Sequence, residues 1–167
     1  LTVAGTSSFT TSANNADITL NNANAFTGTV ALNTTGSSGN ATVVDASGLN
    51  LAASTVGGNL IATATTGNME DSGVLTIAGT SSFTTSANNG TITLNNANAF
   101  GTVALNTSGT GGHATVVDAS GLNLAASTVG GNLIATATTG NMTDDGALAI
   151  TGTTTLTTSA NDATIAL

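Results

Sequence analysis

The chain has 167 residues and a formal net charge of −8, with eight acidic residues, one His and no Lys or Arg. Proteins use Lys and Arg to neutralise nucleic-acid phosphates and to bind anionic lipid, so this composition excludes nucleic acid and charged membrane surfaces as partners. The apolar stretches are far too short for membrane insertion. Cys is absent, so neither disulfides nor thiolate-bound metal support the fold.

The sequence is an internal repeat. The copies cover residues 1–74, 75–147 and, in part, 148–167, and they open with LTVAGTSSFTTSANN, LTIAGTSSFTTSANN and LAITGTTTLTTSAND. Repeats of this kind stack so that each unit covers the apolar face of its neighbour. We therefore predict one continuous solenoid segment over residues 1–167. Because the pattern stops inside a copy, we expect it to be one stretch of a longer array.

Within each copy, apolar and polar residues alternate over short stretches. This period of two is typical of a strand with one buried face, and Thr and Val favour strand over helix. Stretches of Gly, Asn, Asp and Ser between them predict tight turns. In chain order the predicted strands start at Leu1, Ile18, Ala41 and Leu60, then at Leu75, Ile92, Ala114 and Leu133. The spacings, 17, 23, 19 and 15 residues, then 17, 22, 19 and 15, indicate four similar rungs per copy.

The predicted fold class is all-β, a right-handed parallel β-helix (β-solenoid) with about nine rungs of roughly 18 residues. Rungs about 4.8 Å apart would make a rod roughly 43 Å long. Asn59 and Asn132, at repeated turns, are expected to extend the ladder of hydrogen bonds if neighbouring rungs also place Asn there. The predicted inward residues are Leu1, Val3, Ile18, Leu20, Val43, Leu49, Leu51, Leu60, Ala62 and their copies, and the predicted outward residues are Thr2, Thr19, Thr42 and Thr63.

Three stretches carry a resemblance to a known family: NNANAFTGTVALNT, ATVVDASGLNLAASTVGGNLIATATTGNM and DSGVLTIAGTSSFTTSANN. They resemble the central repeats of filamentous-haemagglutinin-like exoproteins, which bacteria export by two-partner secretion. The resemblance implies a secreted, extracellular or bacterial cell-surface β-helix that serves adhesion, aggregation or matrix formation. The secretion domain of that family is not among these residues.

Catalysis is not expected. Parallel β-helix lyases and hydrolases use acidic clusters with Arg or Lys and aromatic sugar platforms, and this chain has no Arg, Lys, Trp or Tyr. Asp45 and Asp118 hold equivalent positions one copy apart, so about four rungs, or roughly 19 Å, should separate them. That distance is too long for a catalytic carboxylate pair. We assign no catalytic residue and no cofactor.

Acidic turns are the remaining chemical feature. Glu70 and Asp71 in the first copy, and Asp144 and Asp145 in the second, offer the oxygen ligands that calcium prefers. Neither turn has the glycine-rich nonapeptide of calcium-binding β-rolls, so solvated turns are the favoured interpretation and no metal site is assigned.

The longest departures from the rung are the loops 33–40 and 106–113, in which His113 replaces Asn40. A lone His without an acidic or nucleophilic neighbour is interpreted as a surface substitution. As exposed loops they are contact candidates, with flexible turns as the alternative. The candidate contact residues are Asn33, Asn40, Asn106 and His113, and Asn33, Asn40, Asn89, Asn106 and Asn141 head N-x-S/T glycan acceptor triplets.

The function hypothesis is a non-enzymatic structural shaft of a secreted bacterial adhesin or extracellular matrix fibre. Its expected partners are flanking repeats of a longer chain, further copies joined end to end or side by side, and cell-surface or matrix glycans. Two alternatives stay open. One is a self-assembling extracellular filament, since open strand edges template pairing. The other is an ice-binding solenoid, for which the outward Thr-x-Thr motif, Thr63-Ala64-Thr65, occurs only in the fourth rung.

Overall fold

The computed structural model describes all 167 residues as one all-β coil without helices. The first copy forms β1 (Thr2–Val3), β2 (Ser7–Asn14), β3 (Ile18–Phe26), β4 (Val30–Thr35), β5 (Ala41–Asp45), β6 (Leu49–Leu51), β7 (Ser54–Val56), β8 (Leu60–Ala64) and β9 (Met69–Asp71). The second forms β10 (Leu75–Asn88), β11 (Ile92–Ser108), β12 (Ala114–Asp118), β13 (Leu122–Leu124), β14 (Ser127–Val129), β15 (Leu133–Ala137) and β16 (Met142–Asp144). The third contributes β17 (Leu148–Ile150), β18 (Thr154–Thr158) and β19 (Ile165–Ala166).

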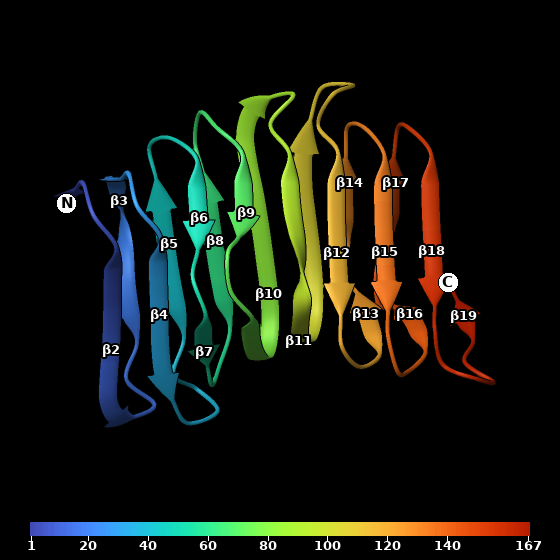
Figure 1. The fold of residues 1–167 in the computed structure, drawn as a ribbon, viewed down its shortest axis with the longest axis horizontal. Helices are drawn as coiled ribbons and strands as arrows, with labels where there is room; N and C mark the ends of the chain where they lie inside the picture. The colour runs from blue at the N-terminus through green and yellow to red at the C-terminus, as the bar shows by residue number, and fades with distance from the viewer.

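All strand pairs are parallel, which confirms the predicted parallel β-helix. In Figure 1 the chain advances from left to right while the nearer strands β12, β15 and β18 run downward, the sense of a right-handed coil. Stacked residues are separated by as few as 19 positions (Ala41 and Leu60) and as many as 23 (Met69 and Ile92). The chain therefore makes about eight turns, which corresponds to a rod about 38 Å long.

The turns are longer and fewer than the strand spacings predict. Ile18, Ala41 and Leu60 do stack on successive turns, so the spacings of 23 and 19 residues are complete turns. Leu60, however, stacks on Ser81 and not on Leu75, so the spacing of 15 residues is not a turn. Each turn crosses both sides of a flattened coil, and alternating segments from the two sides look alike in sequence. Counting every segment as a new rung therefore gives too many rungs.

The sequence repeat and the coil are out of phase by half a turn. Ile18 begins a column that continues through Ala41, Leu60 and Ser81. Ile92, the equivalent of Ile18, lies beyond Ser81 on the opposite side, where it stacks on Met69. One copy thus spans three and a half turns. In Figure 1 the arrows of β5 and β8 point the opposite way to those of their equivalents β12 and β15.

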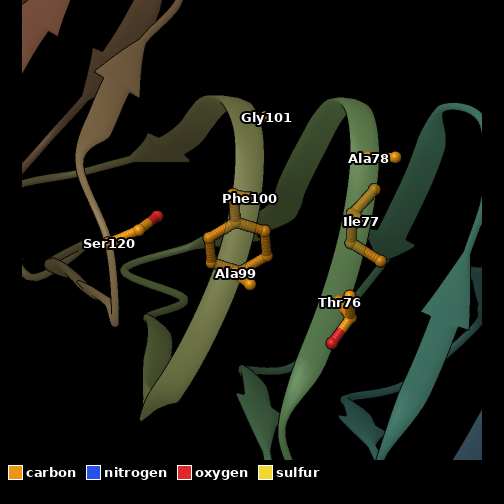
Figure 2. Close-up of a pocket in the computed structure, with 7 residues that line it drawn as sticks. All are labelled: Thr76, Ile77, Ala78, Ala99, Phe100, Gly101 and Ser120. Atoms are coloured by element: carbon orange, nitrogen blue, oxygen red, sulfur yellow. The ribbon is translucent and has the colours of Figure 1, made fainter.

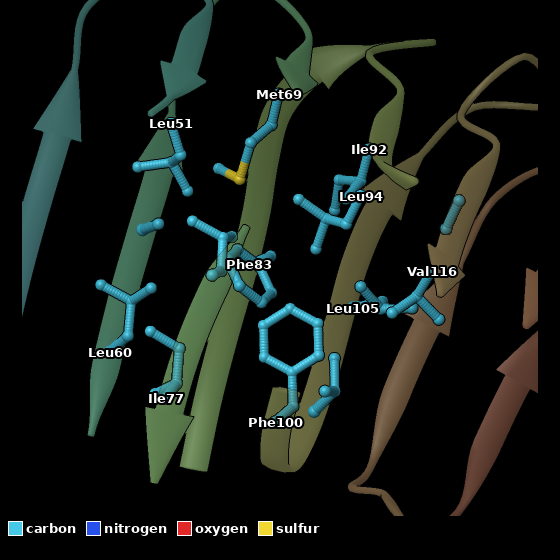
Figure 3. Packing of buried hydrophobic residues seen from close by; sticks show 14 of the residues in the cluster. Leu51, Leu60, Met69, Ile77, Phe83, Ile92, Leu94, Phe100, Leu105 and Val116 are labelled. Atoms are coloured by element: carbon cyan, nitrogen blue, oxygen red, sulfur yellow. The ribbon is translucent and has the colours of Figure 1, made fainter. Parts of the chain in front are cut away.

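The interior is filled by a single cluster of 30 buried apolar residues from both sides of the coil (Figure 3). Of the predicted inward residues of the first copy, Ile18, Val43, Leu49, Leu51, Leu60 and Ala62 are buried, Val3 and Leu20 are partly buried, and Leu1 is exposed. Leu1 is 62% exposed, whereas its copy Leu75 is 0% exposed, because Leu75 has a turn on each side and Leu1 has a turn on one side only. Thr2 and Thr19 are exposed as predicted, and Thr42 and Thr63 are half-buried on the outer surface.

A difference of one residue changes the strands at one corner. The first copy reads Phe26-Thr27-Gly28 where the second reads Phe100-Gly101. In the first copy β3 and β4 are separate, whereas in the second the chain continues through the corner as β11, with a register shift between Ile77 and Thr80 of β10. Both corners keep an edge-to-face aromatic pair, Phe9 with Phe26 and Phe83 with Phe100, at ring distances of 5.8 and 5.7 Å.

Candidate functional site

Two buried carboxylates tie successive turns together. Asp45 is fully buried, and its carboxylate accepts hydrogen bonds from the Phe26 backbone amide (2.9 Å) and from the amide and hydroxyl of Ser47 (2.8 Å each). Asp118 repeats this arrangement with Phe100 and Ser120. Such backbone donors replace the water that a buried carboxylate loses. These two acids are therefore structural.

The carboxylates of Asp45 and Asp118 are also not placed as a pair. The expected separation was four rungs on one side, but the half-turn offset puts them on opposite sides of the coil. Asp45 stacks on Asn24 in the column of one side, and Asp118 stacks on Asn98 in the column of the other. A separation of three and a half turns, about 17 Å along the axis, again excludes a shared substrate bond.

Asn98 extends this polar network in the second copy. It is fully buried, its Oδ1 accepts a bond from the Leu75 amide (2.8 Å), and its Nδ2 donates to Asp71 (2.8 Å). In the first copy, Asn24 Oδ1 likewise accepts from the amino group of Leu1 (2.9 Å), while its Nδ2 donates to backbone carbonyls. The network links the buried Asn of each copy to the first residue of that copy. The sequence does not predict this network, because the Asn-rich segment NNANAF is typical of a turn.

The four calcium candidates do not converge. Asp71 is buried and accepts bonds from the Asn95 amide (3.0 Å) and from Asn98, whereas the adjacent Glu70 points outward and accepts from Asn50 Nδ2 (2.9 Å). Asp145 is exposed and accepts from Asn123 Nδ2 (2.5 Å), and Asp144 stacks on Leu124. No group of three or more His, Cys, Asp or Glu residues comes close enough to hold a metal ion.

Two of the candidate contact residues, Asn40 and His113, take part in a series of hydrogen bonds that link side chains to backbone amides of the next turn at one corner of the coil. Asn40 Oδ1 accepts a bond from the Asn59 amide (2.9 Å), and Asn59 Oδ1 accepts from the Thr80 amide (2.8 Å). In the second copy His113 Nδ1 takes the place of Asn40 Oδ1 and accepts from the Asn132 amide (2.9 Å). Asn59 and Asn132 thus each accept a backbone amide of the next turn. Only Asn59 has an Asn, Asn40, on a neighbouring turn, and beside Asn132 this acceptor is His113.

The loops themselves close as tight turns inside the stack. Thr34 donates from its hydroxyl to the Gly39 carbonyl and accepts from the Gly57 amide of the next turn. Gly36 has a φ of 81°, a conformation that glycine adopts without strain. Asn33 accepts a bond from the Thr55 amide (3.3 Å), and its copy Asn106 stacks on Thr128 and is half-buried. The side chains of these loops therefore bond mainly to neighbouring turns.

Two outer faces are formed by the outward side chains of strands that stack directly on one another. We define face one as the outward side chains of β5, β8 and the second half of β10, and face two as those of β12, β15 and β18. Face one consists of Thr42, Val44, Ile61, Thr63, Ser82 and Thr84, and face two of Thr115, Val117, Ile134, Thr136, Thr155 and Thr157. At the centres lie Ile61 and Ile134, which are 50% and 47% exposed. Ile61 and Ile134 are not among the predicted outward residues, although the apolar outward position in LIATA is a sequence signal for these faces.

One shallow hollow of about 270 Å³ lies at the corner where β10 and β11 bend (Figure 2). It is lined by Thr76, Ile77, Ala78, Ala99, Phe100, Gly101 and Ser120. Its only polar side chains are the hydroxyls of Thr76 and Ser120, and it holds no acid, base or metal ligand. It offers no chemistry beyond a small apolar contact.

The structure contains no helix that could span a membrane. Its continuous stack of parallel strands, its repeated corner bonds and its two outer faces define a parallel β-solenoid repeat protein. Residues 1–33, 38–107 and 111–167 match the family described as repeats of unknown function (DUF5649), and the chain belongs to this family. Both breaks in the match fall at the tight turns that contain Gly36 and Gly109. No curated protein and no solved structure matched the chain.

Proposed function

We propose that this solenoid is the non-enzymatic shaft of a secreted bacterial adhesin or extracellular matrix fibre. The observation that carries the proposal is the parallel ladder, which continues with only local register shifts across two complete copies and into the third. A repeat that continues its own hydrogen-bond ladder can lengthen a protein without a new core. Such a module suits a spacer between a cell surface and a distant contact.

The chemistry of the surface supports a structural role. The buried carboxylates of Asp45, Asp71 and Asp118 are occupied by hydrogen bonds within the fold. The chain carries no Lys, Arg, Trp or Tyr with which to bind and turn over a sugar or phosphate substrate. The resemblance to filamentous-haemagglutinin-like repeats supports the bacterial cell surface as the location and its glycans as contacts.

The length of the rod tests the proposal. A copy of three and a half turns should add about 17 Å to the contour length of the full-length protein. Electron microscopy of parent proteins with one copy removed or added should therefore show rods that differ by that increment. Antibody against the repeat should label intact cells or the extracellular matrix. Compact particles whose length is independent of copy number, or label confined to the cell interior, would refute the shaft.

One observation favours a second candidate, the ice-binding solenoid. Each face presents two parallel columns of small side chains, such as Thr42, Ile61 and Ser82 beside Val44, Thr63 and Thr84. Face two carries one outward Thr-x-Thr pair, Thr155 and Thr157, whereas the columns of face one mix Thr with Val, Ile and Ser. Thermal hysteresis of the purified chain tests this candidate, and its loss in Ile61→Asp would assign the activity to face one.

A further inference from the structure

We propose that face one and face two are lateral docking surfaces for second copies of this chain, each face pairing with the same face of another rod. The inference rests on the proposed shaft function and deepens it by naming a partner for the shaft. Pairing of like faces is the self-complementary arrangement of a two-fold dimer. Because the two faces lie on opposite sides of the coil, each rod then has two neighbours.

The first argument is charge. A partner with the same net charge of −8 can approach only where carboxylates are absent. Both faces contain only Thr, Ser, Val and Ile, and the exposed carboxylates of Asp17, Glu70, Asp145 and Asp162 lie outside them. Two of them lie in line with a face but outside its three strands. Glu70 precedes Thr115 of face two by two turns. Asp145 follows Asp144, which stacks through Leu124 and Val103 on Ser81, three turns beyond face one. Two copies can therefore meet at these faces without opposing charges.

The second argument is shape. The outward side chains of each face form rows about 4.8 Å apart, and a second copy of this chain presents rows with the same spacing. Short, branched side chains such as Ile61, Thr63 and Val44 lose little rotamer freedom on contact and can interdigitate in the way of packed sheets. No aromatic ring or basic side chain is present on either face to recognise a partner of different chemistry.

The third argument is area. The column of face one continues over five turns, from Thr19 through Thr42, Ile61 and Ser82 to Ala104. Five strands about 17 Å wide cover about 400 Å² on each rod, or about 800 Å² in total, which is below the roughly 1,000 Å² of a specific interface and close to the size of a crystal contact. A single contact is therefore weak. In a longer array each face recurs every seven turns, about 34 Å, so many weak contacts act together.

Cross-linking of the 167-residue chain tests the docking. The chain has no native Cys, so Thr63→Cys marks the centre of face one, Thr136→Cys marks the centre of face two, and Ser72→Cys marks an exposed corner. With a bis-maleimide reagent, we expect intermolecular cross-linking of the two face variants to be at least tenfold faster than that of the corner variant. Equal rates at all three positions would overturn the proposal.

Charge substitutions separate the two faces. Ile61→Asp should reduce the cross-linking of Thr63→Cys to the corner rate and leave that of Thr136→Cys unchanged, and Ile134→Asp should do the reverse. Ser72→Asp is the matched control, because the equivalent position of the second copy already carries Asp145. Circular dichroism confirms that each variant keeps its strands. Two outcomes would overturn docking through independent faces: cross-linking of Thr63→Cys that is insensitive to Ile61→Asp, or cross-linking at both faces that falls equally with either substitution. The length of the rod tests the shaft function separately.

Discussion

The carboxylate of Asp45 accepts a hydrogen bond of 2.9 Å from the backbone amide of Phe26, one turn earlier in the coil. Asp118 and Phe100 form the same bond at 2.8 Å in the second copy. In both cases the acid closes a corner where the backbone leaves the strand ladder, and the Phe beside it packs against a second Phe. An acidic side chain therefore completes the backbone hydrogen bonding that a corner would otherwise leave unpaired.

Asp45→Ala should destabilise the chain by about 2–4 kcal/mol, because it leaves the buried Phe26 amide and the Ser47 donors without an acceptor. Asp45→Asn keeps one acceptor oxygen and should cost less. Urea denaturation followed by circular dichroism measures both changes. Glu70→Ala is the control, since Glu70 is exposed, and it should change the free energy of unfolding by less than about 0.5 kcal/mol. Equal effects of the three substitutions would contradict a structural role for Asp45.

His113 is predicted to act through one acceptor atom, Nδ1, which receives the Asn132 amide. His113→Asn should leave stability nearly unchanged, because Asn40 accepts the Asn59 amide in the same way. His113→Ala removes the acceptor and should cost about 0.5–1.5 kcal/mol. Thermal unfolding of the two variants is the measurement. A His113→Ala variant as stable as the native chain would show that the bond contributes nothing.

Ile18 and Thr19 are neighbours that point to opposite sides of one strand, with Ile18 only 7% exposed. Ile18→Asp should unfold the surrounding turns, because it buries a carboxylate without partners. Thr19→Asp places the same charge in solvent and should be tolerated. Hydrogen exchange of β3 and β5 reports the local effect. Similar exchange in the two variants would mean that the assigned register is wrong.

The half-turn offset predicts where equivalent residues lie in space. Biotin attached to Thr63→Cys and Thr136→Cys should bind streptavidin on opposite sides of the rod, about 17 Å apart along its axis. Electron microscopy of the doubly labelled chain shows the two sides directly. In an array with a complete third copy, a Cys at the position of that copy equivalent to Thr63 should lie on the same side of the rod as Thr63. Two copies together make seven whole turns. Labels on a single side would mean that each copy spans a whole number of turns.

Much of the fold follows from the sequence itself. The alternation in segments such as Leu60-Ile61-Ala62 predicts a strand with one buried face, and the repeated copies predict a stack of parallel turns. The corner role of Asn59 and Asn132 also follows, because their recurrence at turns predicts a side-chain ladder. The polar network around Asn24 and Asn98 does not follow from the sequence, because an Asn buried in a strand and an Asn exposed in a turn can have the same local sequence.

The sequence alone determined the all-β parallel coil, because the period of two and the self-similarity are local properties of the chain. The tertiary structure decided the number of turns and the side to which each copy points. Ile18 and Ile92 are identical in local sequence, yet one stacks on Ala41 and the other between Met69 and Ala114 on the opposite side. The bend at each corner sets how many residues complete a turn, and that bend depends on contacts between turns. No local pattern could therefore reveal that Ile61 and Ile134 lie on opposite faces.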